Sequence, residues 1–204
     1  MGAELPANVS VWLILGALPL LLAACTAFTK ISVVLAALRL GLGAERLLPY
    51  GSMLALALVV TTLVMAPVAE GCLAALDMAG GIEAVMVAPL EVGGQVLSPL
   101  WGFLADHADP NQIEVFSDLS ERGPEQPAVL VPAFLLSELA RGLSLAVMIL
   151  LPFVVVDLIC AQVLVLLGLN QTPTAVVALP AKILLFLAAD GWTTVIVGLV
   201  EGYR

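Results

Sequence analysis

Charged residues are scarce in this chain. Only 11% of its 204 residues are charged, against roughly 25% in a typical soluble domain. Hydrophobic residues make up 62%, and the mean hydropathy is +1.14. This composition excludes an ordinary soluble domain and predicts a membrane protein with several spanning segments.

Basic residues are the scarcer of the two charge classes, with seven Lys and Arg against sixteen Asp and Glu, for a net charge of −9. The segment from Glu70 to Glu125 holds ten acids and one base, Arg122, so it contributes −9 alone. The other six acids and six bases cancel. So acidic a segment disfavours nucleic acid or anionic lipid as a partner, and we expect it to be solvated outside the membrane.

Cysteine and histidine are too few to suggest a cofactor. Cys25, Cys72 and Cys160 lie far apart with no CxxC pair, and His107 is the one histidine. A metal site requires more ligands than this, so we predict no metal and no cofactor, and we interpret His107 as a solvated loop residue. Cys25 and Cys160 lie in apolar runs, where cysteine acts as a small hydrophobic residue.

Catalytic motifs are also missing: there is no HExxH, GxSxG, P-loop or GxGxxG pattern. An intramembrane aspartyl protease using Asp157 and Asp190 is a distant alternative, because these residues would be offset by ~9 Å along antiparallel helices. We therefore predict that the protein is not an enzyme and has no catalytic residues. A transporter for a small solute or ion remains the main alternative, because intramembrane charge often marks a transport path.

Long apolar runs predict the helices. Residues 11–29 are uncharged and could form ~29 Å of helix, which is enough to cross a bilayer core. A second apolar stretch begins at Phe28, and a spanning helix begins at Met53 and should end at Pro67 and Glu70. Residues 130–168 should be helical, either as one long helix that leaves the membrane, with a possible bend at Pro152, or as two helices. Residues 174–200 should form the last helix.

The fold class that follows is all-α: four long helices in two bent hairpins, with an acidic, mostly helical extracytoplasmic insertion. We divide the chain into an N-terminal hairpin (1–70), the insertion (71–129) and a C-terminal hairpin (130–204) with a hinge at 169–173. Within the insertion, residues 100–104 and 113–119 suggest short amphipathic helices, and 123–127 a loop. Because Lys30, Arg39 and Arg46 fall between the first two spans, this connection should be cytoplasmic and the insertion outside.

Several charges lie within the C-terminal apolar runs. Hydrocarbon penalises ionised side chains by several kcal/mol, so such charges face protein or water-filled space and tend to pair. We expect a polar seam between helices or subunits in which an acid pairs with a base, with the candidates Glu138, Arg141, Asp157 and Lys182. Asp190 is a further charge in these runs.

Six short motifs follow one another along residues 10–204. They are Phe28-Thr29-Lys30-Ile31 with Leu38-Arg39; Met65-Ala66-Pro67-Val68; Pro132-Ala133-Phe134 with Ser137-Glu138-Leu139; Pro152-Phe153 with Asp157-Leu158 and Gly168; Leu179-Pro180-Ala181-Lys182; and Asp190-Gly191-Trp192. In residue type and spacing the chain resembles the FliP/SctR family, the export-gate proteins of flagellar and injectisome type III secretion.

The resemblance implies a non-enzymatic subunit of the bacterial inner membrane. Family members assemble as a ring of five with a small two-helix FliQ/SctS-type subunit and a FliR/SctT-type subunit, next to the export platform. The complex forms a conical pore for unfolded secreted proteins. Residues 1–10 lack the basic start of a signal sequence, which favours the injectisome branch over the flagellar one.

The resemblance also places the pore constriction at the hinge. The family usually has consecutive methionines there, whereas this chain has Leu169, Asn170 and Gln171. Ala181 likewise replaces a phenylalanine of the family. Methionine is soft and seals by apolar packing, so a gate built from Asn and Gln would be wetter and would close by hydrogen bonds. An ordinary polar turn at residues 170–173 is the alternative interpretation.

Overall fold

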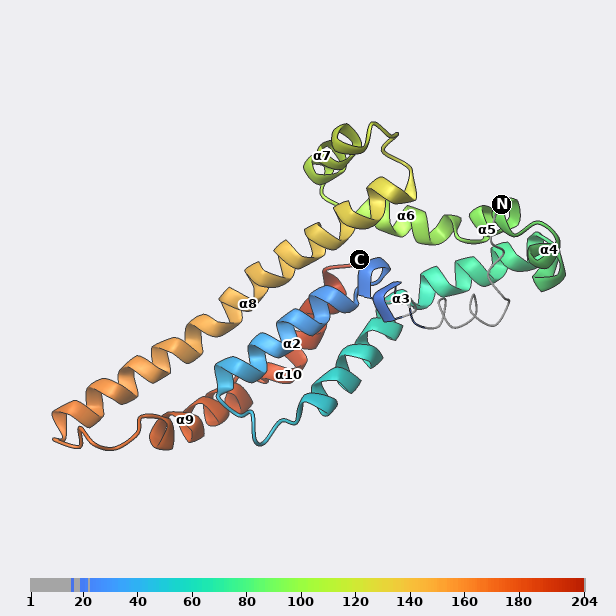
Figure 1. Ribbon diagram of the computed structural model, residues 1–204. Helices are drawn as coiled ribbons and strands as arrows, with labels where there is room; N and C mark the ends of the chain where they lie inside the picture. The colour runs from blue at the N-terminus through green and yellow to red at the C-terminus, as the bar shows by residue number, and fades with distance from the viewer. Residues whose placement is uncertain (1–15, 17–18, 22, 204) are drawn as a thin grey trace. The chain divides into compact units, whose positions relative to one another are not determined.

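The computed structural model describes residues 16, 19–21 and 23–203, and these form helices joined by turns (Figure 1). The helices are α2 (Phe28–Leu42), α3 (Tyr50–Met78), α4 (Gly81–Val87), α5 (Pro89–Val96), α6 (Ser98–His107), α7 (Pro110–Ser120), α8 (Pro127–Leu166), α9 (Ala175–Ala188) and α10 (Gly191–Glu201). This confirms the all-α class.

Two of these helices, α3 and α8, are long and apolar enough to cross a membrane by length and composition. The number rises to four if each of two broken helix pairs counts as one span. One pair is α9 and α10, and the other joins the segment before α2 to α2. Within the described residues, the helices therefore fit a membrane protein.

Helix α3 is longer than the sequence predicts. It continues through Pro67 and ends at Met78, so the expectation that Pro67 and Glu70 end it is wrong. A proline inside a helix removes a backbone donor and introduces strain, but long helical runs on both sides can maintain the helix with a bend. Gly80 and Gly81, with φ of 97° and 76°, end this stretch because glycine adopts positive φ without a steric cost.

Helix α8 is a single helix of 40 residues. Pro132 and Pro152 both lie inside it, so the alternative of two helices is wrong. At 1.5 Å per residue its length is ~60 Å, about twice the hydrocarbon thickness of a bilayer. Part of α8 must then lie outside the hydrocarbon or be strongly tilted.

The last helical segment is broken where the sequence predicts continuity. Helices α9 and α10 meet at an angle of 61°, so a single helix over 174–200 is wrong. Pro180 lies within α9, and the break falls at Asp190, which has φ of 47°. Gly191 follows in close contact with the Phe186 ring: an added Cβ would lie 2.2 Å from it. The break thus depends on Asp190 and Gly191.

The predicted first span lies partly outside the described residues. In its described part, a bend at Thr26 and a turn at Ala27 precede α2. The Thr29 hydroxyl donates to the Ala23 carbonyl over 2.6 Å. As predicted, a separate helix begins at Phe28, and it ends before Gly43, whose φ is 65°.

The chain divides into two compact units. Unit 1 contains residues 65–138 and the described residues before 30, and unit 2 contains residues 30–64 and 139–203. In unit 1 the two short helices expected within the acidic segment are present as α6 and α7. Residues 121–126 form the expected loop, and Pro127 begins α8.

Aromatic packing holds α6 to the start of α8 within unit 1. The rings of Phe103 and Phe134 lie 5.7 Å apart, and both side chains are buried. At the start of α7, the Asp109 side chain accepts a hydrogen bond from the Asn111 amide, and the Asp109 amide donates to Ser137 Oγ over 2.8 Å. These contacts fix α6, α7 and the first turns of α8 together.

His107 is not a loop residue, contrary to expectation. It occupies the last turn of α6 and is partly buried. Its Nδ1 lies 2.9 Å from the Phe103 carbonyl, and its ring lies 4.4 Å from the Phe103 ring. The imidazole therefore packs as part of the α6 structure.

Helix α2 is the most buried helix of unit 2. Ile31, Val34, Leu35 and Leu38 are at most 1% exposed and recur at helical spacing. Figure 1 shows α2 beside α8, and Gly142 explains how closely these helices approach. A Cβ on Gly142 of α8 would lie 3.3 Å from the Lys30 Cα.

The Gly191 contact gives a first prediction. Replacing Gly191 by Ala should lower the stability by about 1–3 kcal/mol, because the added methyl group overpacks the Phe186 ring. The matched control is Gly198→Ala in the same helix, where an added Cβ meets no atom within 4 Å. Thermal unfolding of the detergent-purified variants measures both, and equal midpoints for the two would contradict the prediction.

Candidate functional site

A buried lysine links three helices of unit 2. Lys182, on α9, is 7% exposed. Its Nζ donates to the Gly41 carbonyl of α2 over 2.9 Å and lies 2.6 Å from Asp157 Oδ2 of α8. One ammonium group thus connects segments that are far apart in the sequence.

The Gly41 carbonyl belongs to the last turn of α2. The final carbonyls of a helix lack donors within the helix, and they form the negative end of its dipole. Lys182 supplies both a donor and a positive charge at this position. It therefore caps α2 from a different helix, and Asp157 balances the charge.

Close packing makes the cap possible. A Cβ on Gly41 would lie 2.6 Å from Phe153 and 2.9 Å from Leu150, both on α8. Only glycine lets the end of α2 approach α8 this closely. Phe153 of α8 also packs near Phe186 of α9, and the centroids of the two rings lie 6.4 Å apart.

Asp157 is less enclosed than its partner. Its side chain is 46% exposed, whereas that of Lys182 is 8% exposed. The flanking residues Val154 and Leu158 are exposed apolar side chains. Asp157 therefore presents a hydrogen-bond acceptor within the apolar stretch of α8 that runs from residue 145 to 161.

The other two predicted seam residues also lie on α8. Glu138 is buried, whereas Arg141 is exposed. The structure shows one of the proposed acid–base pairs, Asp157 with Lys182. The role of all four residues as a seam stays a prediction.

The predicted hinge joins α8 to α9 and is exposed in the single chain at Leu169, Asn170 and Gln171. Gly168 has φ of 74°. Its amide donates to the Val165 carbonyl over 3.0 Å, and the Leu169 amide to the Leu164 carbonyl over 2.9 Å. This is a Schellman motif, so the start of the hinge is a defined helix end.

Asp157 and Asp190 do not share a site of the kind a protease requires. Asp157 pairs with Lys182, whereas Asp190 Oδ1 accepts a hydrogen bond from the Thr193 hydroxyl. Two carboxylates of a catalytic dyad have to lie against each other. Among the described residues, no group of three metal-ligating side chains lies close together.

Sequence reasoning missed two basic residues that unit 2 uses internally. Lys30 is 3% exposed, and its Nζ lies 3.3 Å from the centre of the Tyr203 ring, a cation–π contact. The Arg39 guanidinium donates to the Leu48 and Glu45 carbonyls, over 2.6 and 3.0 Å. It thereby holds the connection between α2 and α3. Both residues lie in the first family-like motif, the signal that could have found them.

Comparison with known proteins identifies the family. The FliP family model matches residues 11–199. This chain belongs to the FliP family. A "Flagellar biosynthetic protein FliP" from Cereibacter sphaeroides is 36% identical over 91% of this chain and 63% of its own length.

Relatives in secretion systems match over more of their own length. "Yop proteins translocation protein R" from Yersinia pestis is 32% identical over 98% of both chains. "Hypersensitivity response secretion protein HrcR" from Ralstonia nicotianae is 34% identical over 92% of both. The relatives thus include proteins named for flagellar biosynthesis and proteins named for translocation or secretion, and the predicted family resemblance is confirmed.

The Lys182 cap gives a second prediction. Lys182→Met should lower the stability by about 1.5–3 kcal/mol, because a hydrogen bond from a charged donor to a buried carbonyl is lost. Asp157→Asn should cost less, since the amide oxygen can still accept a bond and the site is half exposed. In a double-mutant cycle the two changes should couple by about 0.5–3 kcal/mol.

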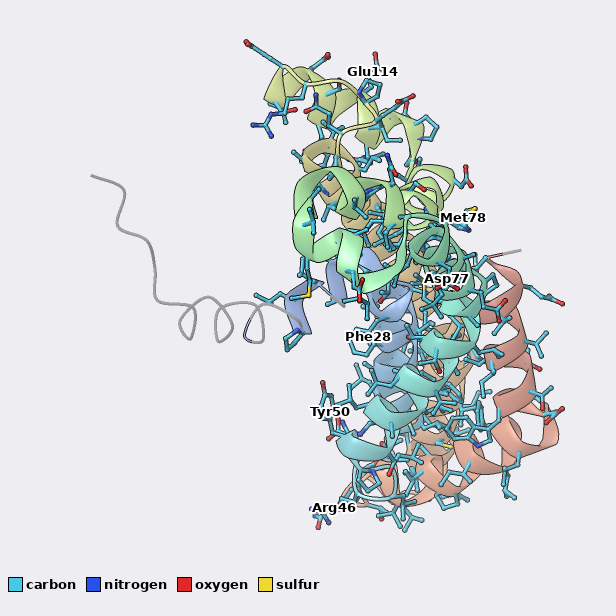
Figure 2. All side chains as sticks on the ribbon, turned by 90° about the vertical axis from the view of Figure 1, so that its right-hand side faces the viewer. Phe28, Arg46, Tyr50, Asp77, Met78 and Glu114 are labelled. Carbon is cyan, nitrogen blue, oxygen red and sulfur yellow. The ribbon has the colours of Figure 1, made fainter. Side chains whose placement is uncertain are left out.

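Thermal unfolding in detergent measures this cycle. The control is Arg46→Met, which removes an exposed base in the loop after α2, labelled in Figure 2. Changes at such a site usually stay within about 0.5 kcal/mol. A Lys182→Met protein as stable as the Arg46→Met control would show that the cap is dispensable.

Proposed function

We propose that this chain is a core subunit of a type III protein export gate. About five copies would join FliQ/SctS-type and FliR/SctT-type subunits in a conical pore that passes unfolded proteins. The family match over residues 11–199 carries this proposal, because it spans both apolar halves and the hinge. No catalytic role is assigned to any residue.

The surface of α8 supports assembly with neighbours. Large apolar side chains are exposed along its length, including Leu143, Val147, Met148, Leu151, Val155, Ile159 and Val163. An apolar surface this extensive is stable only against lipid or protein. Asp157 lies among these residues with about half of its side chain open, so in the assembly it would accept hydrogen bonds from a neighbouring subunit while it holds Lys182.

The chain would lie in the bacterial inner membrane as two bent helical hairpins, with the acidic segment extracytoplasmic. The basic connection around Arg46 favours a cytoplasmic side, and the charge of −9 between residues 70 and 125 favours the outside. The ~60 Å length of α8 supports a placement in which part of the protein rises above the hydrocarbon.

Leu169, Asn170 and Gln171 would line the constriction of the pore. They are exposed in the single chain, and they follow a helix end that the Schellman motif fixes. A ring of amide side chains would close by hydrogen bonding and hold water. The polar seam of Glu138, Arg141, Asp157 and Lys182 would keep helices and neighbouring subunits in register.

Native mass tests the assembly. The chain should be expressed with and without its two small partner subunits, extracted in detergent and measured by native mass spectrometry. We expect a discrete oligomer of about five copies that gains partner subunits on coexpression. A monomer or dimer unaffected by the partners would reject the export gate and favour the small-solute transporter.

A substitution at the hinge tests the constriction. Replacing Asn170 and Gln171 together by Met should reduce the leak of small ions through the closed assembled complex, because apolar packing excludes water that amides retain. Planar-bilayer conductance measures the leak. Gln126→Met, in the loop before α8, is the control and should leave conductance unchanged. Equal ion leaks in the hinge variant and the control would show that the hinge does not form the constriction.

A further inference from the structure

Unit 1 carries a mainly apolar groove that lies apart from the lysine cap and the hinge of unit 2 in the sequence. Its volume is about 400 Å³. It lies between α6, the loop after α7 and the start of α8, and is lined by Trp101, Gly102, Ala105, Ile113, Pro124, Glu125 and Leu130. Gly102, Ala105, Pro124 and Glu125 are exposed, so the groove opens at the surface.

The groove is built on a fixed base. Leu130 is 3% exposed and belongs to the same first turns of α8 as the buried Phe134, which packs on Phe103 of α6. The Asp109 amide and Ser137 Oγ join the start of α7 to α8 over 2.8 Å. The walls are thus preformed, and a ligand would not have to order them.

The small side chains of α6 leave the space open. An added Cβ on Gly102 would meet no atom within 4 Å. A volume of about 400 Å³ is within the ~300–1,000 Å³ range typical of ligand pockets. The groove can therefore accept large apolar side chains.

The surroundings of the groove are strongly acidic. Residues 98–126 hold six acids and one base, a net charge of −5. Glu125 lines the groove itself, and Asp106, Glu114, Asp118 and Glu121 are exposed on the same helices and loop. Figure 2 shows Glu114 at the outer side of α7. The same acidic segment from a second copy would be repelled, whereas a basic partner would be attracted.

We infer that this groove is a docking site for a basic, amphipathic protein segment. Apolar side chains of the segment would enter between Trp101, Ile113 and Leu130, and its Lys or Arg side chains would face Glu125 and the acidic residues around it. This groove lies within unit 1, whereas the proposed pore constriction lies at residues 169–171 of unit 2.

The test uses the full chain in lipid nanodiscs. The probe is a dye-labelled lysine–leucine peptide with leucines at helical spacing, and the same peptide with glutamate for lysine is the charge control. Fluorescence anisotropy gives Kd. Gly102→Leu fills the groove without a clash at Cβ and improves helix propensity, so the fold should persist. Gly94→Leu on α5, where an added Cβ is equally free, is the matched control.

We expect the lysine peptide to bind the unchanged chain and Gly94→Leu equally. Gly102→Leu should raise Kd roughly ten- to hundredfold, the loss of one buried apolar side chain. Glu125→Gln should raise Kd several-fold at low salt and less at high salt, whereas Glu83→Gln on α4 should not. No binding, equal binding of both peptides, or binding unaffected by Gly102→Leu would each overturn the inference.

Discussion

The arrangement of unit 2 depends on one buried ammonium group. Lys182 would be costly in an apolar interior if it were unpaired, and it is held by the Gly41 carbonyl and the Asp157 carboxylate. The Gly41 carbonyl attracts the ammonium group because it lies at the negative end of the α2 dipole. The Asp157 carboxylate can stay charged because its half-exposed position can be reached by water or by a neighbouring subunit. The lysine thus stabilises a helix end and sets the register of α8 and α9 together.

Glycine makes that arrangement possible at several points. Gly41 lets α2 meet Phe153, Gly142 lets α8 meet the Lys30 backbone, and Gly191 lets α10 begin against Phe186. A side chain at any of these positions would come too close to the neighbouring helix, so the neighbouring side chain or the helix itself would have to shift. The ion pair with its 2.6 Å separation tolerates little such movement.

The sequence predicted what local chemistry determines. Apolar runs predicted the all-α class and the helix that begins at Phe28, and the need to pair buried charges predicted Asp157 with Lys182 as one possibility. It failed at Pro67, which lies inside α3, and in the last apolar segment, where the helix breaks at Asp190 and Gly191. A proline inside a helix removes one backbone hydrogen bond, and the apolar turns on both sides of Pro67 continue the helix despite this cost.

The candidate site was predictable only in part for a related reason. The acceptor on α2 is the backbone carbonyl of Gly41, and because every residue has such a carbonyl, the sequence does not indicate which one binds the lysine. Lys30 and Arg39 were interpreted as charges that orient the protein in a membrane, yet one packs on Tyr203 and the other binds loop carbonyls. Of these three bases, Arg46 is the one that is exposed.

Helix α8 brings these observations into one element. It begins next to Glu125 and contributes Leu130 to the groove, and it supplies Phe153 and Asp157 to the lysine cap. It ends at Leu166, in the Schellman motif that precedes the polar hinge. Pro132 and Pro152 lack a backbone donor in the interior of this helix, so they are the positions at which α8 can bend.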